Sequence, residues 1–319
     1  MMRLEDRFHL VQEDDAAWIC ERLRWHKLMP LAASLSDPRQ PKCAMLNAAF
    51  HEMLIENLAQ EQHYFNQVKA VFALFENKGI RFTPYKGPFW GGQIYPQYSW
   101  RHIGDIDLIM SVDGARAAAA ILKKQGYRLE VLGETVEDDL RTRGELTCHP
   151  DPAMKHLVPV QLHWELMPAP RFLKRHYIIP DDFAADSTAA EWKSIRFSLP
   201  TPEARLLYHV LHATCQHQFN RFVLIMEMAL FIRKHPGLDW NRLFDLAKAR
   251  QCLAPLHYGL SFVSAFCDIP AQACEIIRMT KPKLLTRLVA AWLTPRATLH
   301  LTARRGRTRR KLFRVAMSW

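Results

Sequence analysis

Apolar residues recur every three or four positions over long parts of the chain, which is the spacing of the buried face of an amphipathic helix. Two such stretches, residues 14–35 and 44–78, predict an N-terminal helical segment that ends at Gly79. From Thr201 onward the same spacing returns, with prolines and a glycine between the periodic runs. We expect helices there over residues 202–217, 220–234, 240–250, 254–267 and 271–279.

The middle of the chain, residues 79–200, has a different pattern of short apolar runs between turn residues, which is typical of strands. A helix is expected at 115–125, and the acidic residues 134–145 predict a mobile loop or a short helix. The expected strands are 80–85, 103–110, 127–132, 147–149, 157–166 and 195–199. The pattern therefore predicts an α+β fold with a mixed sheet, divided into residues 1–78, 79–200 and 201–319.

Composition adds few restrictions. Hydrophobic residues make up 49% of the 319 positions, so the chain can form a sizeable core. No apolar run reaches the roughly 18–20 residues that span a bilayer, and the first residues lack the apolar centre of a signal peptide. The seven cysteines are dispersed without a Cys-x-x-Cys pair, which fits a reducing compartment. We therefore expect a cytoplasmic protein with no transmembrane segment.

The formal net charge of +11 is concentrated at the C-terminal end. Most of the excess comes from one basic run, whose members are Arg304, Arg305, Arg307, Arg309, Arg310, Lys311 and Arg314. This run and the apolar segment 284–301 before it have two interpretations. They form a solvated tail or a helix on the core, or they contact an acidic partner, nucleic acid or an anionic membrane surface.

Two carboxylates lie two positions apart in an apolar run, at Asp105 and Asp107. A strand sends such residues to the same face, where they suit a divalent cation that carries phosphates. Solvent-facing aspartates at a strand end are the alternative interpretation. One segment earlier, Lys86-Gly87 follows another expected strand, and a turn there offers backbone N–H groups to phosphate oxygens. This layout favours a phosphate-handling site.

These motifs resemble the uncharacterised nucleotidyltransferase family of the polymerase-β-type superfamily. The resemblance begins at Lys86-Gly87 and continues through Arg101 and residues 104–109. Later segments match in the same order and extend it over roughly residues 45–265. They are residues 122–127, 160–166, 206–212, 226–229 and 239–247.

The resemblance implies a nucleotidyltransferase-type palm with N-terminal helices and a C-terminal helical domain. It also implies an ATP-type nucleoside triphosphate substrate and Mg²⁺ (or Mn²⁺) as cofactor, with transfer of a nucleoside monophosphate and release of pyrophosphate. The acceptor stays open between RNA, a protein or peptide, and a small molecule. Asp105 and Asp107 would hold the metal, and the expected nucleotide-binding residues are Lys86, Gly87, Arg101 and Gly104.

One position departs from the family pattern. Enzymes of this type use a third carboxylate on a neighbouring strand, and Gln161 occupies that position here. An amide oxygen can ligate magnesium but is a poor base. Glu165 lies on the same expected strand face and is a substitute candidate. The alternative is a catalytically degenerate nucleotide-binding or scaffold protein of a biosynthetic pathway.

Histidines supply the remaining candidates. Strand alternation places His163 on the face of Gln161 and Glu165, which predicts an exposed cleft wall where it orients phosphate or moves a proton; a core histidine is the alternative. On an expected helix, His209, His212 and Cys215 recur at three-residue spacing. A zinc site of this kind needs four ligands, so we favour a structural or substrate-side role. The resemblance to the family implies that His212 faces the cleft.

Overall fold

The computed structural model describes residues 12–36, 44–87, 93–165 and 187–282. The basic run and the segment 284–301 lie outside these residues. Within them, no helix combines the length and apolarity that crossing a bilayer requires.

A five-stranded mixed sheet forms the middle of the molecule, in the order β1-β2-β5-β4-β3. Only β2 and β5 are parallel; the other neighbours are antiparallel. The strands are β1 Thr83–Tyr85, β2 Ile106–Ile109, β3 Arg128–Leu129, β4 Glu145–His149 and β5 Val160–His163. The mixed sheet between helical parts confirms the predicted α+β fold.

The two faces of this sheet differ in chemistry because the pleat alternates side chains between them. Leu108, Leu162 and Leu146 are aligned across three strands and are fully buried on one face. They belong to a core that includes α3 (Ala44–Glu76) and α5 (Val112–Lys124). The other face carries Asp107 and Gln161, which are partners in the β2–β5 register, and it is turned toward the C-terminal helices.

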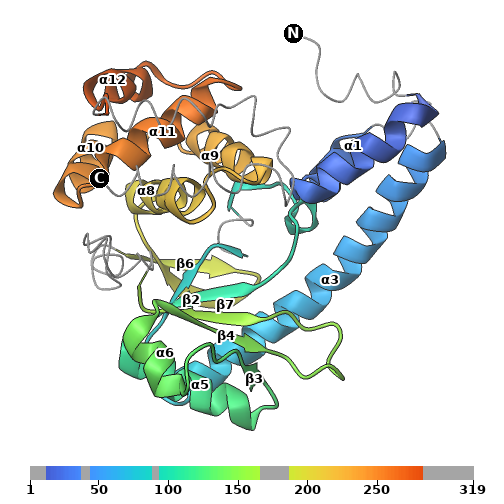
Figure 1. Cartoon of the computed structure of the whole chain (residues 1–319), viewed down its shortest axis with the longest axis vertical. Helices are drawn as coiled ribbons and strands as arrows, with labels where there is room; N and C mark the ends of the chain where they lie inside the picture. The colour runs from blue at the N-terminus through green and yellow to red at the C-terminus, as the bar shows by residue number, and fades with distance from the viewer. Residues whose placement is uncertain (1–11, 37–43, 88–92, 166–186, 283–319) are drawn as a thin grey trace.

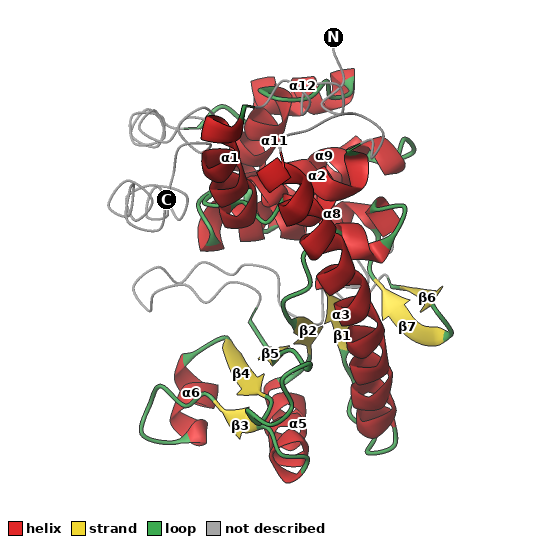
Figure 2. Ribbon diagram, turned by 90° about the vertical axis from the view of Figure 1, so that its right-hand side faces the viewer, coloured by secondary structure: helices red, strands yellow, loops and turns green. Residues whose placement is uncertain are grey.

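Helices enclose the sheet from two sides. In Figure 1, α8–α12 gather on one side of the strands, while α5 and α6 (Val136–Thr142) lie on the other. The long helix α3 runs from α1 and α2 down beside the strands (Figure 2). A short 3₁₀ helix, η2 (Tyr98–Trp100), packs on α3. Helix α3 confirms the helix predicted over residues 44–78 to within two residues at its C-terminal end.

Helix α3 also carries buried polar side chains that hydrogen-bond to the backbone of the sheet region. They are Asn57, Tyr64 and Gln67. Asn57 donates to the carbonyl oxygens of Ser99 and Arg101, at 2.6 and 2.9 Å. Tyr64 donates to the carbonyl oxygen of Asp105, and Gln67 hydrogen-bonds to both the N–H and the carbonyl group of Val158. Because buried polar groups need partners, α3 fixes the loops that enter β2 and β5.

The single N-terminal helix predicted over 14–35 is wrong. The structure has two helices, α1 (Glu13–Trp25) and α2 (Met29–Leu35), with a turn at His26–Lys27. Pro30 explains the break, because its ring has no N–H and would collide with the carbonyl group of His26 in a continuous helix. That carbonyl oxygen instead accepts a bond from Val223 N.

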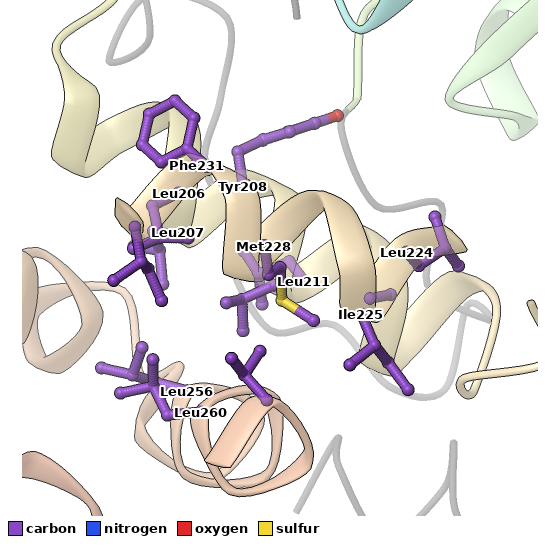
Figure 3. Packing of buried hydrophobic residues seen from close by; sticks show 14 of the residues in the cluster. Leu206, Leu207, Tyr208, Leu211, Leu224, Ile225, Met228, Phe231, Leu256 and Leu260 are labelled. Atoms are coloured by element: carbon purple, nitrogen blue, oxygen red, sulfur yellow. The ribbon is translucent and has the colours of Figure 1, made fainter. Parts of the chain in front are cut away.

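The C-terminal helices match the sequence prediction closely. They are α8 Pro202–Leu211, α9 Phe222–Lys234, α10 Trp240–Ala249, α11 Leu253–Ser264 and α12 Ala271–Met279. Buried leucine and methionine side chains of α8 and α9, among them Leu207, Leu211 and Met228, point toward Leu256 and Leu260 of α11 (Figure 3). The predicted helix 202–217 is interrupted, because its last turn is a π-helix, η3 (His212–Gln216).

Two elements were not predicted as found. Strand β6 (Thr188–Trp192) pairs with β7 (Ile195–Leu199) in a separate hairpin, and only β7 was expected. Its two turn residues, Lys193 and Ser194, both have positive φ although neither is glycine or asparagine, so the usual hairpin signal is missing. Strand β4 begins at Glu145, two residues before the expected strand and inside the segment expected to be a loop or helix.

Candidate functional site

A cavity of about 290 Å³ lies between the polar face of the sheet and the helical half of the molecule. Its walls include six residues expected at the site: Lys86, Arg101, Gly104, Asp105, Gln161 and His212. Side chains that the sequence analysis did not assign to the site complete it. They are Lys27, His102, Glu145, Gln216, His217, Asn220, Arg221, Val223, Leu224 and Glu227.

Asp105 and Asp107 lie at the start of β2, and the side chain of Gln161 on β5 reaches toward them. Gln161 is the register partner of Asp107, and its Nε2 atom is 3.4 Å from Asp105 Oδ2. Asp107 is buried beneath the cavity wall, and its Oδ1 atom contacts His163 Nε2 at 2.9 Å and Lys86 Nζ at 3.4 Å. The two carboxylates therefore share one face with the lysine.

The two carboxyl groups have opposite pKa shifts. Burial and the charge of Asp107 raise the pKa of Asp105, and the nearby cations Lys86 and Arg101 only partly offset this. Burial also acts to raise the pKa of Asp107, but the charge of Lys86 and the hydrogen bond from His163 outweigh burial and lower it. The surroundings thus favour the ionised form of Asp107 over that of Asp105.

The Lys86-Gly87 turn depends on a close approach to α3. Both residues have positive φ, at 53° and 54°. A Cβ atom at Gly87 would lie 2.6 Å from the Tyr64 hydroxyl oxygen, so only glycine fits without a shift. Lys86 extends over the Tyr85 ring, 4.4 Å from its centroid, toward Asp107. The turn is thereby held next to the carboxylates.

Arg101 faces the cavity and also ties β2 to helix α9. Its Nε atom donates to Glu227 Oε1 at 2.8 Å, and the carboxylate is almost completely buried. Burial acts against the charged guanidinium, but Glu227 outweighs it and raises the pKa of Arg101 above its usual range. Tyr95 and His209 are also near Glu227. One edge of the Arg101 guanidinium is therefore already bonded within the protein.

The α1–α2 turn brings an unpredicted cation, Lys27, into the cavity wall. The turn is anchored at the start of α9, where Phe222 N donates to His26 Nδ1 at 3.1 Å. Arg221 lies over the Trp25 ring, 3.6 Å from its centroid, and donates to the Trp25 carbonyl oxygen. Burial of the ammonium group lowers the pKa of Lys27, although the nearby Asp105 opposes this.

Histidines form part of the helical wall. His212 faces the cavity, as expected, and its ring centroid is 4.3 Å from that of His217. Burial and the charge of Lys86 lower the pKa of both rings, to about 3 for His217. His209 is instead buried against the Leu224 carbonyl oxygen at 3.1 Å. Among the described residues, no three His, Cys, Asp or Glu side chains converge as a metal site, which leaves the zinc interpretation without support.

The structure places His163 and Glu165 differently from the expectation. His163 is buried between Asp107 and Glu145, so the predicted exposed cleft wall is wrong. Strand β5 ends at His163, and the next two N–H groups both bond to the Gly144 carbonyl oxygen. Glu165 therefore lies beyond the ladder; it is exposed and outside the cavity lining.

The carboxylate pair suits a magnesium ion. Asp107 Oδ2 is buried and has no hydrogen-bond partner in the described part of the chain, so one oxygen is available to a ligand. Asp105 lines the open side of the same site. Magnesium keeps several waters and is held by one or two carboxylates together with substrate phosphates, so no larger protein cage is needed.

A lysine–glycine turn follows β1, and two carboxylates lie at the adjacent strand β2 of a mixed sheet. Together with the helices that cover this face of the sheet, they define a palm of the nucleotidyltransferase type. A comparison with protein families agrees with this class. The model of an uncharacterised nucleotidyltransferase family matches residues 12–268, and the chain belongs to that family. No curated protein matches the chain.

Proposed function

We propose that this protein is a magnesium-dependent enzyme that transfers a nucleoside monophosphate from a nucleoside triphosphate, such as ATP, to an acceptor and releases pyrophosphate. One observation carries the proposal. The carboxylates of Asp105 and Asp107 adjoin a cavity whose wall also contains four cationic side chains, and these are Lys27, Lys86, Arg101 and Arg221. Carboxylates for a cation next to cations for phosphates match a metal–triphosphate ligand.

Each residue has a defined part in this proposal. Asp105 and Asp107 would hold Mg²⁺ (or Mn²⁺), which supplies charge neutralisation at the phosphate oxygens when bound. Lys86 neutralises Asp107 in the free protein and is close enough to turn to a phosphate oxygen instead. The turn at Gly87 would offer backbone N–H groups to phosphate oxygens, while Gly104, which has no side chain, leaves room for the phosphates beside Asp105.

The transfer needs little covalent chemistry from the protein. An acceptor hydroxyl or phosphate oxygen attacks the α-phosphorus in line, and the bond to the pyrophosphate oxygen breaks. Arg101, Lys27 and Arg221 are placed to bind the negative charge that develops on the leaving pyrophosphate. Catalysis rests on positioning and electrostatics. RNA, a protein or peptide, and a small molecule are the acceptor classes to test.

A radiolabelled transfer assay tests the site. The full chain is incubated with α-labelled nucleoside triphosphates, Mg²⁺ or Mn²⁺ and each acceptor class. We expect Asp105→Ala and Asp107→Ala to lose at least about 100-fold in rate, because each removes one of the two carboxylates that would hold the metal ion. Asp113→Ala, an exposed carboxylate on α5, is the control and keeps full rate. Transfer that persists in both site variants would show that the chemistry occurs elsewhere.

A nucleotide-binding protein without turnover is the second candidate. It is favoured by the amide of Gln161 at the position of the third carboxylate, directly opposite Asp107. A metal-dependent rise in melting temperature with nucleotide, but no pyrophosphate release with any acceptor, would select this function. Pyrophosphate release that depends on Asp105 would exclude it.

A further inference from the structure

The site described so far has no group that accepts the proton of an attacking hydroxyl. Asp105 and Asp107 are assigned to the metal and phosphates, and the neighbouring strand offers the amide of Gln161. An amide cannot take up a proton at neutral pH. If the proposed transfer uses a hydroxyl acceptor, this protein needs a base at another position.

The strand on the other side of β5 provides a carboxylate. In the β4–β5 register, Thr147 is opposite Gln161 and Glu145 is opposite His163. Directly paired residues share a face, so Glu145 projects from the same side of the sheet as Asp107. It lines the cavity with Asp105 and Gln161, and its side chain is 25% exposed. Glu145 therefore faces the same cavity as the candidate metal-binding carboxylate Asp105.

The contacts of Glu145 leave one of its oxygens open to a further hydrogen bond. Its Oε2 atom is buried and has no hydrogen-bond partner among the described residues. His163 Nδ1 lies 3.4 Å from this oxygen, and the other ring nitrogen of His163 lies 2.9 Å from Asp107 Oδ1. The His163 ring therefore lies between the two carboxyl groups and orients the side chain of Glu145.

The other titratable side chains of the cavity are less suited to this task. His212 and His217 face it from the helical half, but burial and the charge of Lys86 lower the pKa of both. They resist protonation near neutral pH. Glu227 is bound by Arg101. Besides Asp105, which is assigned to the metal, Glu145 is the carboxylate on the sheet side that lines the cavity without an ion pair to a lysine or arginine in the described structure.

We propose that Glu145, oriented by His163, is the general base of this enzyme and takes the place of the third carboxylate that Gln161 lacks. This inference rests on the proposed transferase function. The acceptor O–H proton passes to a Glu145 oxygen while the acceptor oxygen bonds to the α-phosphorus. The bond from that phosphorus to the pyrophosphate oxygen breaks, and pyrophosphate carries away the electron pair. Glu145 later returns the proton to solvent.

Single-turnover kinetics of the full chain test this role. Glu145→Gln keeps the shape of the side chain but cannot accept the proton, so we expect transfer to a hydroxyl acceptor to fall about 10²- to 10⁴-fold. The dissociation constant of a Mn²⁺–nucleotide complex and the melting temperature are measured in parallel and are expected to change little. Glu145→Asp retains a carboxylate and should keep more of the rate than Glu145→Gln.

A matched control comes from the same sheet. Glu130 also contacts a histidine, with Oε2 3.0 Å from His149 Nε2, but it lies outside the cavity lining. Glu130→Gln should leave the rate unchanged. A Glu145→Gln rate within threefold of wild type, or equal losses in the Gln and Asp variants, overturns the proposal while wild-type transfer still supports the proposed function. No transfer by the wild-type protein with any acceptor overturns both.

Discussion

The Tyr64 hydroxyl group donates a 2.9 Å hydrogen bond to the carbonyl oxygen of Asp105, and the same hydroxyl occupies the space beside Gly87. One side chain of α3 therefore fixes both the strand that carries the carboxylates and the turn that carries Lys86. The spacing between these two parts of the candidate site is set by a residue that itself lies outside the cavity lining.

Gly87→Ala is expected to destabilise the protein by about 1–3 kcal/mol, because alanine is strained at positive φ and its methyl group meets the Tyr64 hydroxyl. Urea unfolding measures the loss. Adding Tyr64→Phe removes the clash but not the backbone strain, so the double variant should be more stable than additivity of the single changes predicts. Purely additive effects would show that the close contact has no energetic role. Gly237→Ala is the control, since its position is open and has no positive φ.

The ion pair of Arg101 and Glu227 is expected to matter strongly for stability. Glu227→Gln leaves the buried guanidinium without its counter-charge, which costs about 3–5 kcal/mol. Replacing both residues with methionine should recover much of that loss, because no buried charge remains. Arg116→Ala breaks ion pairs on the exposed surface of α5, where solvent screens them, and should therefore cost much less than Glu227→Gln. Equal losses at the two sites, measured by urea unfolding, would contradict this difference.

Lys27 is expected to act on the phosphates of the nucleotide. Lys27→Met should weaken binding of a metal–triphosphate complex by about 10-fold, since one charge-assisted contact is worth roughly 1.5–3 kcal/mol before screening. Binding of the corresponding nucleoside should change little, because it has no phosphate. Isothermal titration calorimetry measures both. A similar loss for the nucleoside would indicate that Lys27 supports the fold of the α1–α2 turn instead. Arg24→Met, on the exposed side of α1, is the control.

Acid is expected to destabilise the helical half through its buried histidines. Burial lowers the pKa of His209 from 6.5 to about 4. Between these values the unfolded chain binds a proton that the folded chain excludes, so stability falls as the pH decreases from about 6.5 toward 4. The free energy of unfolding measured from pH 7.5 to 5 should show this slope. His209→Gln should make it shallower, and an unchanged slope would assign the effect to other groups.

The sequence predicted those parts of the site that depend on neighbours along the chain. Asp105 and Asp107 are two residues apart on a strand, and Lys86-Gly87 follows directly after one, so periodicity and turn chemistry were sufficient. The place of Lys27 in the cavity wall was not predicted, because the apolar spacing predicts one continuous helix over residues 14–35 and does not show the break before Pro30. The position of Lys27 also depends on bonds to residues of α9, almost 200 positions away.

Glu145 and Glu227 illustrate a second reason why parts of the site could not be predicted from the sequence. Glu145 was assigned to an acidic loop or helix, because strand pairing with β5, and not local propensity, extends β4 by two residues. Glu227 lies in the apolar first part of α9, and its contact with Arg101 shows why a carboxylate is buried there. Tertiary partners of this kind leave no local pattern.

The anchoring of the α1–α2 turn on α9 also affects when activity can begin during synthesis. A nascent polypeptide released only through residue 200 would contain the acidic strand and the lysine–glycine turn, yet it would lack Arg221 and the docking point for Lys27. Ribosome-bound intermediates of that length should therefore be inert. The site is complete only after α9 has been synthesised and the α1–α2 turn has bound to it.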